Sequence, residues 1–367
     1  MISAIFAAAL AVAANCDLEH PSGRPGCTRA AVDALPMNAI QVIGTHNSYK
    51  KAIAPAEFAL IKAVQPKLAA TLDYSKPPLA AQLDAGARQL ELDFVYDPAG
   101  GRFASPLALK MANDAAAAPY DPEPMKRPGM KVMHVPDFDY RSVCPTFVAC
   151  ISEIRAWSKA HPDHLPILVI FNLKDDKLEG VPGAAEVLPF DAHAMDVLDA
   201  EIRSVFPAGA LITPDRVQGK RATLREAVAA GGWPRLKTAR GKVMFAMDEG
   251  KTKTSLYRGD RKVLEGRAAF INTDEDSPAA AYITLNEPFE LAGRIEKALK
   301  AGLIVRTRAD ADTVEARAND RARQDAAFAT GAQYVSTDYL APDTRFGPYE
   351  THLPGGGVGR LNPITAR

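Results

Sequence analysis

The sequence has few aromatic residues and no excess of charge of either sign. Trp, Tyr and Phe make up 7% of the 367 residues, and 44 acidic residues balance 44 basic ones. Proteins that hold single-stranded nucleic acid use aromatic stacking platforms, and duplex binding needs a broad basic surface. Because the composition provides neither, no nucleic-acid partner is expected.

Several sequence signatures of other protein classes are also missing. No Gly-x-Gly-x-x-Gly follows an expected strand, which disfavours an open doubly wound sheet that binds a dinucleotide. The absence of Gly-x-Ser-x-Gly disfavours a serine esterase, and the absence of His-Glu-x-x-His disfavours a zincin. No segment has an uninterrupted apolar run long enough to span a bilayer.

Cysteine is scarce, and its four positions form two local pairs: Cys16 with Cys27, and Cys144 with Cys150. This spacing favours two short-loop disulfides, which form in an oxidising compartment. The alternative is a zinc site, but neither pair has the Cys-x-x-Cys spacing and no histidine lies at a matching interval.

Residues 1–14 form a short apolar stretch rich in alanine. Their length and small residues are typical of a cleavable secretory signal, although the usual basic segment is missing. The alternative is a buried N-terminal helix. With the cysteine pairs, this stretch predicts a secreted or periplasmic protein whose remaining residues, 15–367, form one domain.

Eight short apolar runs alternate with helical stretches along the chain. The expected strands are residues 40–44, 89–96, 131–135, 167–173, 243–247, 268–272, 303–306 and 334–337. The main expected helices are residues 55–72, 79–85, 147–161, 192–205, 223–229, 288–300 and 313–330. This alternation predicts an α/β fold, a (β/α)8 TIM-like barrel with long loops at 98–128 and 175–241 and a C-terminal surface tail from residue 342.

The stretch Gly44-Thr45-His46-Asn47 follows the first apolar run. In a parallel barrel, the carboxyl ends of the strands meet at one rim, where catalytic residues usually lie. Polar residues also occupy the ends of the other expected strands: Glu91 and Asp93, His134, Asn172 and Lys174, Asp248, Asp274, Arg306 and Arg308, and Asp338. Asp248 and Asp274 are equally well explained as helix caps or turn residues.

Glu91 and Asp93 are two positions apart on one expected strand, so their carboxylates share a face. Like charges on one face repel, and a divalent cation would relieve the repulsion. Oxygen ligands favour Ca²⁺, with Mg²⁺ possible, over zinc. The amide oxygens of Asn47 and Asn172 could complete the set. The alternative is an ion pair to Arg88 or Lys174.

Two histidines on one rim suggest acid–base catalysis. One of His46 and His134 can take a proton from an attacking hydroxyl while the other gives one to a leaving alkoxide. A cation would polarise phosphoryl oxygens, and Lys174, Arg306 and Arg308 could bind phosphate charge.

The sequence resembles the phosphatidylinositol-specific phospholipase C superfamily, and most closely its secreted calcium-dependent phospholipase C-like branch. The resemblance covers roughly residues 38–340. The motifs that carry it are residues 44–49, residues 82–88 running into Glu91-Leu92-Asp93, residues 134–139 running to Cys144 and Cys150, residues 166–175, Thr213-Pro214-Asp215, Gly232-Trp233-Pro234 and Ser336-Thr337-Asp338-Tyr339.

The resemblance implies a role for each matching residue. It implies that His46 is the general base for the inositol 2-hydroxyl and that His134 is the general acid for the diacylglycerol leaving group. Asn47, Glu91 and Asp93 match calcium ligands, and Asp338 is implied as a partner that orients His46. The chain departs from the family on the fourth strand, where Asn172 and Lys174 stand in place of a further acidic ligand.

These features predict a secreted phosphoric diester hydrolase that acts on phosphatidylinositol-type lipids at a membrane surface. Its products would be diacylglycerol and a cyclic or open inositol phosphate. One alternative is a hydrolase similar to glycerophosphodiester phosphodiesterases, in which water attacks. Another is a barrel that binds lipid or sugar without catalysis.

Overall fold

The computed structural model describes residues 12–13, 15–112 and 119–365. Nearly all of the expected signal peptide, residues 1–11 and 14, lies outside the described residues, so that segment stays a prediction. No helix within the described ranges is long and apolar enough to cross a membrane.

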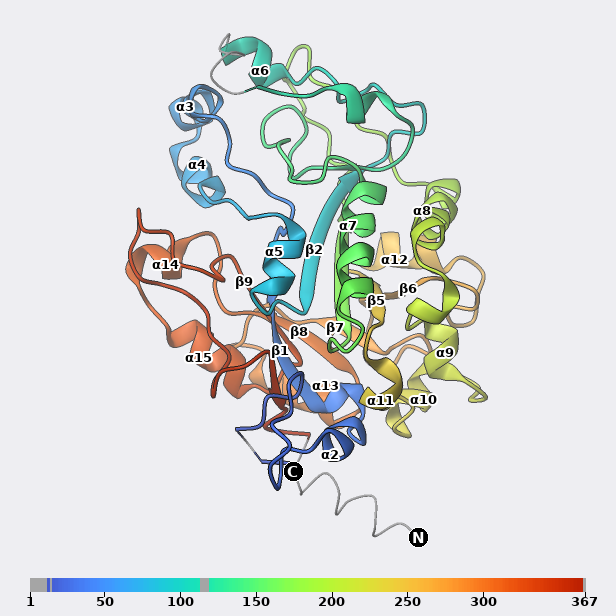
Figure 1. Ribbon diagram of the computed structural model, residues 1–367. Helices are drawn as coiled ribbons and strands as arrows, with labels where there is room; N and C mark the ends of the chain where they lie inside the picture. Colours follow the sequence, from blue (N-terminus) through green and yellow to red (C-terminus); the bar gives the residue numbers. More distant parts are fainter. Residues whose placement is uncertain (1–11, 14, 113–118, 366–367) are drawn as a thin grey trace.

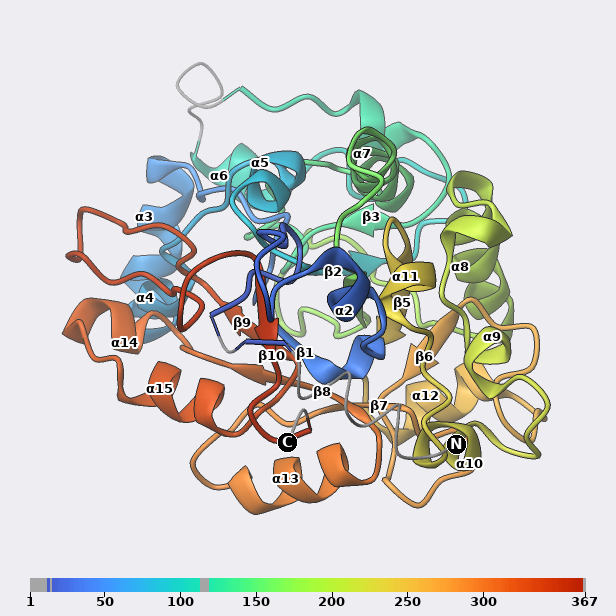
Figure 2. The same ribbon diagram turned by 60° about the horizontal axis from the view of Figure 1, so that its bottom comes forward.

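Eight parallel strands form a nearly closed barrel (Figures 1 and 2), as the sequence predicts. Around the wall they follow the order β6, β5, β4, β2, β1, β9, β8, β7, and one parallel bridge between Asn272 and Tyr282 joins the two ends. Their bounds are β1 Ile40–Thr45, β2 Gln89–Val95, β4 Ile167–Leu173, β5 Val243–Met247, β6 Ala269–Ile271, β7 Tyr282–Thr284, β8 Ile304–Arg308 and β9 Tyr334–Thr337.

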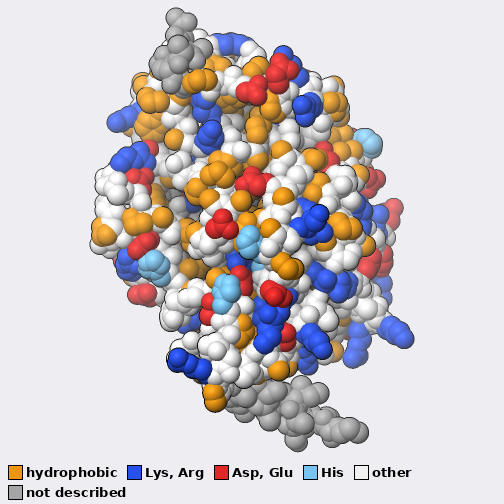
Figure 3. Space-filling view, viewed as in Figure 1, with side chains coloured by type: hydrophobic (Ala, Val, Ile, Leu, Met, Phe, Trp, Pro, Cys, Tyr) orange, Lys and Arg blue, Asp and Glu red, His pale blue; other side chains and the backbone are white. Residues whose placement is uncertain are grey.

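Helices surround this wall, and Figure 2 shows the larger ones outside the strands, with the short helix α2 in front of the barrel opening. The α-helices are α2 Arg29–Asp33, α3 Pro55–Val64, α4 Pro66–Leu72, α5 Leu79–Asp84, α6 Leu107–Ala112, α7 Phe147–Ala160, α8 Ala192–Val205, α9 Pro214–Gln218, α10 Leu224–Ala229, α11 Leu236–Ala239, α12 Lys251–Arg258, α13 Ala292–Lys300, α14 Val314–Ala318 and α15 Ala322–Ala329. Short 3-10 helices are η1 Met37–Ala39, η2 Glu123–Lys126 and η3 Ala208–Ala210. Charges of both signs are interspersed on the face shown in Figure 3.

The core lies between the barrel and its helices. Strand β4 is buried along almost its whole length, as expected for a strand covered on both faces. Phe94 of β2 packs on Phe171 of β4 and on Phe147 of α7, with ring centres 5.6 and 4.7 Å apart. Ile151 and Ile154 of α7 are also fully buried. The apolar stripe predicted for this helix therefore faces the wall.

The prediction that residues 131–135 form a barrel strand is wrong. Only Lys131–Val132 (β3) is extended, and it pairs antiparallel with the end of β2 outside the wall. The eighth wall strand is instead β7, three residues that sequence reasoning missed because so short a run shows no periodicity. His134 therefore lies in a loop beside the carboxyl-terminal half of β2, next to Met133, whose N–H donates to the carbonyl of Asp93.

Two predicted helices are broken. The stretch 55–72 divides into α3 and α4 at Gln65, where Pro66 cannot supply a helical N–H and begins a new helix. The stretch 313–330 divides into α14 and α15 at Asn319, whose backbone is left-handed with φ 50°. The helix predicted at 288–300 begins later, at Ala292.

Both predicted disulfides are present, Cys16–Cys27 and Cys144–Cys150, which rules out the zinc alternative. The predicted C-terminal surface tail, from residue 342, is in part built into the fold. Residues Gly359–Leu361 (β10) pair antiparallel with the start of β1, and Tyr349 is buried.

Candidate active site

His46 and Asp338 are the first residues beyond two neighbouring strands. Strands β1 and β9 are parallel, with Thr45 beside Thr337, so the next residue of each emerges at the same point on the rim. The imidazole Nδ1 of His46 lies 2.7 Å from Oδ1 of Asp338. If Nδ1 carries the proton, it donates to the carboxylate and Nε2 is left as the free basic nitrogen. Nε2 lies 3.7 Å from Oε1 of Glu91.

Gly44, two residues before His46, allows strands β1 and β2 to approach each other closely. A Cβ on Gly44 would lie 2.1 Å from Oε1 of Gln89 on β2, so no other residue fits here without a shift of that side chain.

Asp338 is enclosed by hydrogen-bond donors and cations. Arg308 Nη2 lies 3.0 Å from Oδ2 of Asp338, and the ammonium of Lys76 donates to the Asp338 carbonyl. Asp310 fixes the backbone behind it, accepting from the Asp338 N–H at 2.7 Å. Burial disfavours the charged carboxylate, but His46, Arg308 and Lys76 outweigh it and hold the pKa of Asp338 below its usual range.

Burial also controls His46. Desolvation and the neighbouring Arg308 guanidinium disfavour the imidazolium more than Asp338 favours it, which lowers the pKa of His46 to about 3. The imidazole is therefore neutral near pH 7, the state in which it can accept a proton.

His134 has its own carboxylate partner. Its Nδ1 lies 2.9 Å from Oδ2 of Asp139, and Oδ1 of Asp139 accepts from Lys50 Nζ at 2.8 Å. The side chains of Lys50 and Asp139 are completely buried. The Met133 N–H donates to the carbonyl of Asp93 at 3.1 Å, which places His134 at the same end of the barrel as His46.

Glu91 and Asp93 each hold a cation from another strand. Oε2 of Glu91 lies 2.7 Å from Arg306 Nη2 on β8, and Oδ2 of Asp93 lies 2.9 Å from Lys174 Nζ beyond β4. The predicted alternative ion pair to Lys174 thus forms. The one to Arg88 does not, because Arg88 pairs with Glu19. Burial raises the pKa of Glu91 to about 7, although Arg306 opposes the shift.

The remaining oxygen atoms suit a hard cation. Among the described residues, Oδ1 of Asp93 is buried without a hydrogen-bond partner, and Oε1 of Glu91 has only the distant contact with His46. Asn47 donates through Nδ2 to the Tyr74 hydroxyl at 2.8 Å, and its Oδ1 has only a long 3.4 Å contact with Tyr49. Two carboxylate oxygens and one amide oxygen fit a Ca²⁺ ligand set. Within the described ranges, no three His, Cys, Asp or Glu side chains converge as a metal cluster.

Asn172, Asp248 and Arg306, which were also predicted as site residues, lie next to Glu91 and Asp93. Asn172 lies beside Asp93 in the β2–β4 register, and its Nδ2 donates to the carbonyl of Asp248. Arg306 Nη1 bonds Asn286 Oδ1 at 2.6 Å and lies 3.9 Å from Asp248. Arg306 is thus engaged by side chains of the protein itself.

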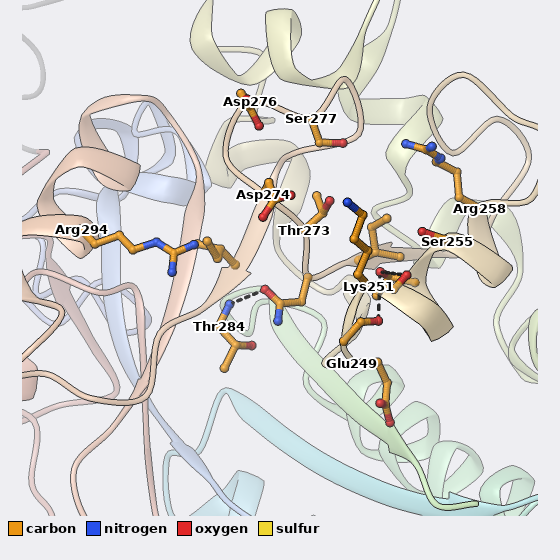
Figure 4. A pocket seen from close by; sticks show the side chains of 15 residues that line it. Glu249, Lys251, Ser255, Arg258, Thr273, Asp274, Asp276, Ser277, Thr284 and Arg294 are labelled. Atoms are coloured by element: carbon orange, nitrogen blue, oxygen red, sulfur yellow. Dashed lines mark hydrogen bonds between the residues drawn. The ribbon is translucent and has the colours of Figure 1, made fainter.

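Asp274 is not part of this cluster. It lines a separate polar cavity of about 410 Å³ beyond β5, β6 and β7 (Figure 4). Lys251 and Arg258 of α12 and Arg294 of α13 line the same cavity.

Sequence reasoning missed the residues that support the histidines. Lys50 lies only four positions after His46, and Asp139 five after His134, so spacing could have suggested both. Tyr74, Lys76 and Asp310 lie in loops without a pattern, and only the folded chain brings them to the site.

The pKa of His46 gives a direct test of this electrostatic arrangement. Nitrogen-15 NMR of the imidazole should show a neutral ring between about pH 5 and about pH 8, because its pKa is about 3. Arg308→Met removes a repelling cation and should raise this pKa, whereas Asp338→Asn removes the counter-charge and should lower it. A wild-type ring that titrates near pH 6.5, or equal effects of both variants, would contradict the arrangement.

Comparison with known protein families assigns the chain to one of them. The family model described as "Phosphoinositide phospholipase C, Ca2+-dependent" matches residues 35–363. No curated protein sequence matches the chain.

Two solved structures are similar in fold. One is a calcium-dependent phosphoinositol-specific phospholipase C from a Pseudomonas species, with TM-score 0.53 and 18% identity, covering 89% of this chain and 95% of that one. The other is a Ca²⁺-dependent phosphatidylinositol-specific phospholipase C from Streptomyces antibioticus, with TM-score 0.54 and 21% identity, covering 83% and 94%. With the family match over most of its length, this chain belongs to the Ca²⁺-dependent phosphoinositide phospholipase C family, a family of phosphoric diester hydrolases.

Proposed function

We propose that this protein cleaves phosphatidylinositol-type lipids to diacylglycerol and a cyclic inositol phosphate. The observation that carries the proposal is the pair of histidines at one end of the barrel, each hydrogen-bonded through Nδ1 to a buried carboxylate. Each ring then has Nε2 available for the substrate, one to accept a proton and one to donate it.

In the proposed reaction, Nε2 of His46 takes the proton of the inositol 2-hydroxyl. That oxygen attacks phosphorus, and the bond from phosphorus to the diacylglycerol oxygen breaks. His134, protonated at Nε2, gives its proton to the departing oxygen. The low pKa of His46 supports its role as the acceptor, because the ring is neutral before substrate binds. Asp338 keeps the reactive tautomer in place.

Charge on the phosphoryl oxygens needs a positive partner. Asn47, Glu91 and Asp93, with Asn172 beside them, would hold Ca²⁺, and Mg²⁺ would suit the same oxygen ligands less well. When bound, the cation would polarise the phosphoryl group and lower the pKa of the attacking hydroxyl. Lys174 and Arg308 would bind phosphate oxygens, while Arg306 would chiefly keep Glu91 in position.

The substrate lies in a bilayer, and helix α3 suits contact with one. The buried residue of α3 is Glu57, whose carboxylate accepts hydrogen bonds from Tyr140 and Arg141. At the end of α3 and the start of α4, Val64 and Leu68 are exposed instead, with 79% and 44% of their surface accessible to solvent. Lys62 and Lys67 are exposed beside them. In Figure 1 these helices lie beyond the carboxyl ends of the strands, on the side of the site. Apolar side chains flanked by lysines fit an anionic lipid surface.

Two disulfides support a secreted or periplasmic location for this reaction. We propose that residues 1–14 serve as the export signal. N-terminal sequencing of the mature protein, recovered from medium or periplasm, would show whether the chain begins near residue 15 or keeps its first methionine.

Phosphorus NMR during turnover tests the proposed reaction. With calcium, phosphatidylinositol should give the cyclic phosphodiester signal, and chelator should suppress it. His46→Ala and His134→Ala should each reduce turnover by roughly 100-fold or more, the usual contribution of a general acid or base. An acyclic product formed from the start would favour attack by water, as in a glycerophosphodiester phosphodiesterase. Full activity in both variants would reject catalysis by these histidines.

Vesicle sedimentation tests the contact with lipid. The double variant Val64→Asp, Leu68→Asp should bind anionic vesicles at least about tenfold more weakly, because burying each apolar side chain contributes on the order of 1.5 kcal/mol or more. Its hydrolysis of a soluble inositol phosphodiester should be unchanged. The matched control is Phe289→Asp, which replaces an exposed residue (56%) just before α13. Equal loss in both proteins would contradict a specific role for α3 and α4.

A further inference from the structure

Each histidine–carboxylate pair is backed by a buried lysine. Behind His134, Asp139 accepts from Lys50 Nζ at 2.8 Å. Behind His46, the Lys76 ammonium donates to the Asp338 carbonyl, contacts the Thr337 carbonyl at 3.4 Å and lies 3.8 Å from Oδ1 of Asp338. Both lysine side chains are almost completely inaccessible to solvent. They contact the carboxylate residues and not the histidines themselves.

The two lysines share one aromatic ring. Lys50 Nζ lies 5.2 Å and Lys76 Nζ 5.3 Å from the ring centre of Tyr74, within the range of cation–π attraction. The Lys76 N–H also donates to the Lys50 carbonyl at 2.8 Å.

Tyr74 in turn contacts the residues that follow β1. Its hydroxyl accepts from Asn47 at 2.8 Å, and its ring stacks near His46, with ring centres 6.4 Å apart and planes at 25°. The segments at residues 47–50 and 74–76 therefore form one connected unit next to the two histidine–carboxylate pairs.

Stability alone is a poor explanation for this unit. Moving an ammonium group and a carboxylate out of water costs several kcal/mol per ion, and well-packed apolar residues often replace such pairs without loss. What the ion pairs provide instead is fixed geometry, because each lysine restrains a carboxylate that already holds a histidine. Tyr74 then restrains the lysines relative to each other.

We propose that Lys50 and Lys76 are positioning residues with separate tasks. Lys50 would orient the proton donor His134 through Asp139, and Lys76 would orient the proton acceptor His46 through Asp338. Tyr74 would set their relative placement. The assignment of donor and acceptor rests on the proposed function.

Leaving-group chemistry separates the two tasks. An alkoxide such as that of diacylglycerol needs a proton as it departs, whereas a nitrophenolate leaves without one. A badly placed donor therefore slows cleavage of the alkyl ester alone. A badly placed acceptor slows both substrates, because the same 2-hydroxyl must be activated in each.

The test compares Lys50→Met and Lys76→Met on phosphatidylinositol and on an inositol nitrophenyl phosphodiester. Lys50→Met should lower kcat by at least about tenfold on the lipid and by less than about threefold on the nitrophenyl ester, as expected for partial loss of a general acid. Lys76→Met should lower kcat on both by similar factors. Equal losses on both substrates in Lys50→Met would overturn the assignment.

Lys131→Met is the matched control. Lys131 is equally buried, with Nζ 2.7 Å from the Gly129 carbonyl and 3.4 Å from Asp97, but neither partner contacts a histidine. Its kcat should stay within about threefold of wild type on both substrates. A loss like that of Lys50→Met would show that removing any buried lysine produces the effect, and would reject the proposal.

If Lys50→Met or Lys76→Met does not fold, a second variant can be tested in its place. The pair Lys50→Met, Asp139→Asn removes both charges and leaves no unpaired ion, and Lys76→Gln keeps a donor for the carbonyl of Asp338. The double variant should show the pattern of Lys50→Met. Lys76→Gln, which keeps the donor but loses the ammonium 3.8 Å from Oδ1 of Asp338, should show a smaller loss that is similar on both substrates. If these replacements show no such pattern, the proposal fails.

Imidazole nitrogen NMR tests the positioning without substrate. The wild-type protein should show the Nδ1–H tautomer in the neutral ring of His46, and Lys76→Met should alter the signals of His46 but not of His134. Lys50→Met should do the reverse. If wild type hydrolyses neither ester but these shifts appear, the proposed function fails while the positioning stands. Unchanged shifts in active variants would reject the positioning alone.

Discussion

The site depends on compensation between buried carboxylates and cations that come from different strands. Glu91 and Asp93 of β2 meet Arg306 of β8 and Lys174 beyond β4, and Asp338 after β9 meets Arg308 of β8. An isolated buried charge of this kind would cost several kcal/mol. The barrel makes the arrangement possible, because its parallel strands deliver acidic and basic side chains to one rim, from neighbouring strands for Asp93–Lys174 and Asp338–Arg308 and across the rim for Glu91–Arg306. In the part of the chain that the structure describes, one oxygen of Asp93 is left without a hydrogen-bond partner, and burial, helped by Arg308, keeps His46 neutral.

The convergence of strand ends at this rim allowed part of the site to be predicted from sequence. Polar residues that follow apolar runs converge in any parallel barrel, so His46, Glu91, Asp93, Arg308 and Asp338 could be grouped without coordinates. The ion-pair partner of each charged residue could not be predicted in this way. Whether Asp93 meets Lys174 or a metal ion depends on angstrom-scale geometry that spacing does not contain. Strand β7 was missed because three residues carry no period, and the run at 131–135 was misassigned because local apolarity does not distinguish a wall strand from an antiparallel strand outside it.

Residue Lys174 marks where this chain differs from the pattern that its family resemblance implies. An acid at this neighbourhood of β4 would strengthen a calcium site, whereas the Lys174 ammonium, 2.9 Å from Oδ2 of Asp93, would repel a cation bound there and already engages that oxygen. The family is described as Ca²⁺-dependent. In this chain, we infer that a bound cation and Lys174 would share the neutralisation of Asp93, so that calcium would bind weakly and Lys174 would supply part of the positive charge that faces the phosphate.

Calorimetric titration of Ca²⁺ into wild type and Lys174→Met tests that inference most directly. Removing a positive charge this close to the ligand should tighten calcium binding by at least about tenfold, given the strength of Coulomb interactions near a protein surface. Lys253→Met is the control, because Lys253 is similarly exposed and pairs with Asp175 at 2.7 Å; its affinity should match wild type. Unchanged or weaker calcium binding in Lys174→Met would contradict the account.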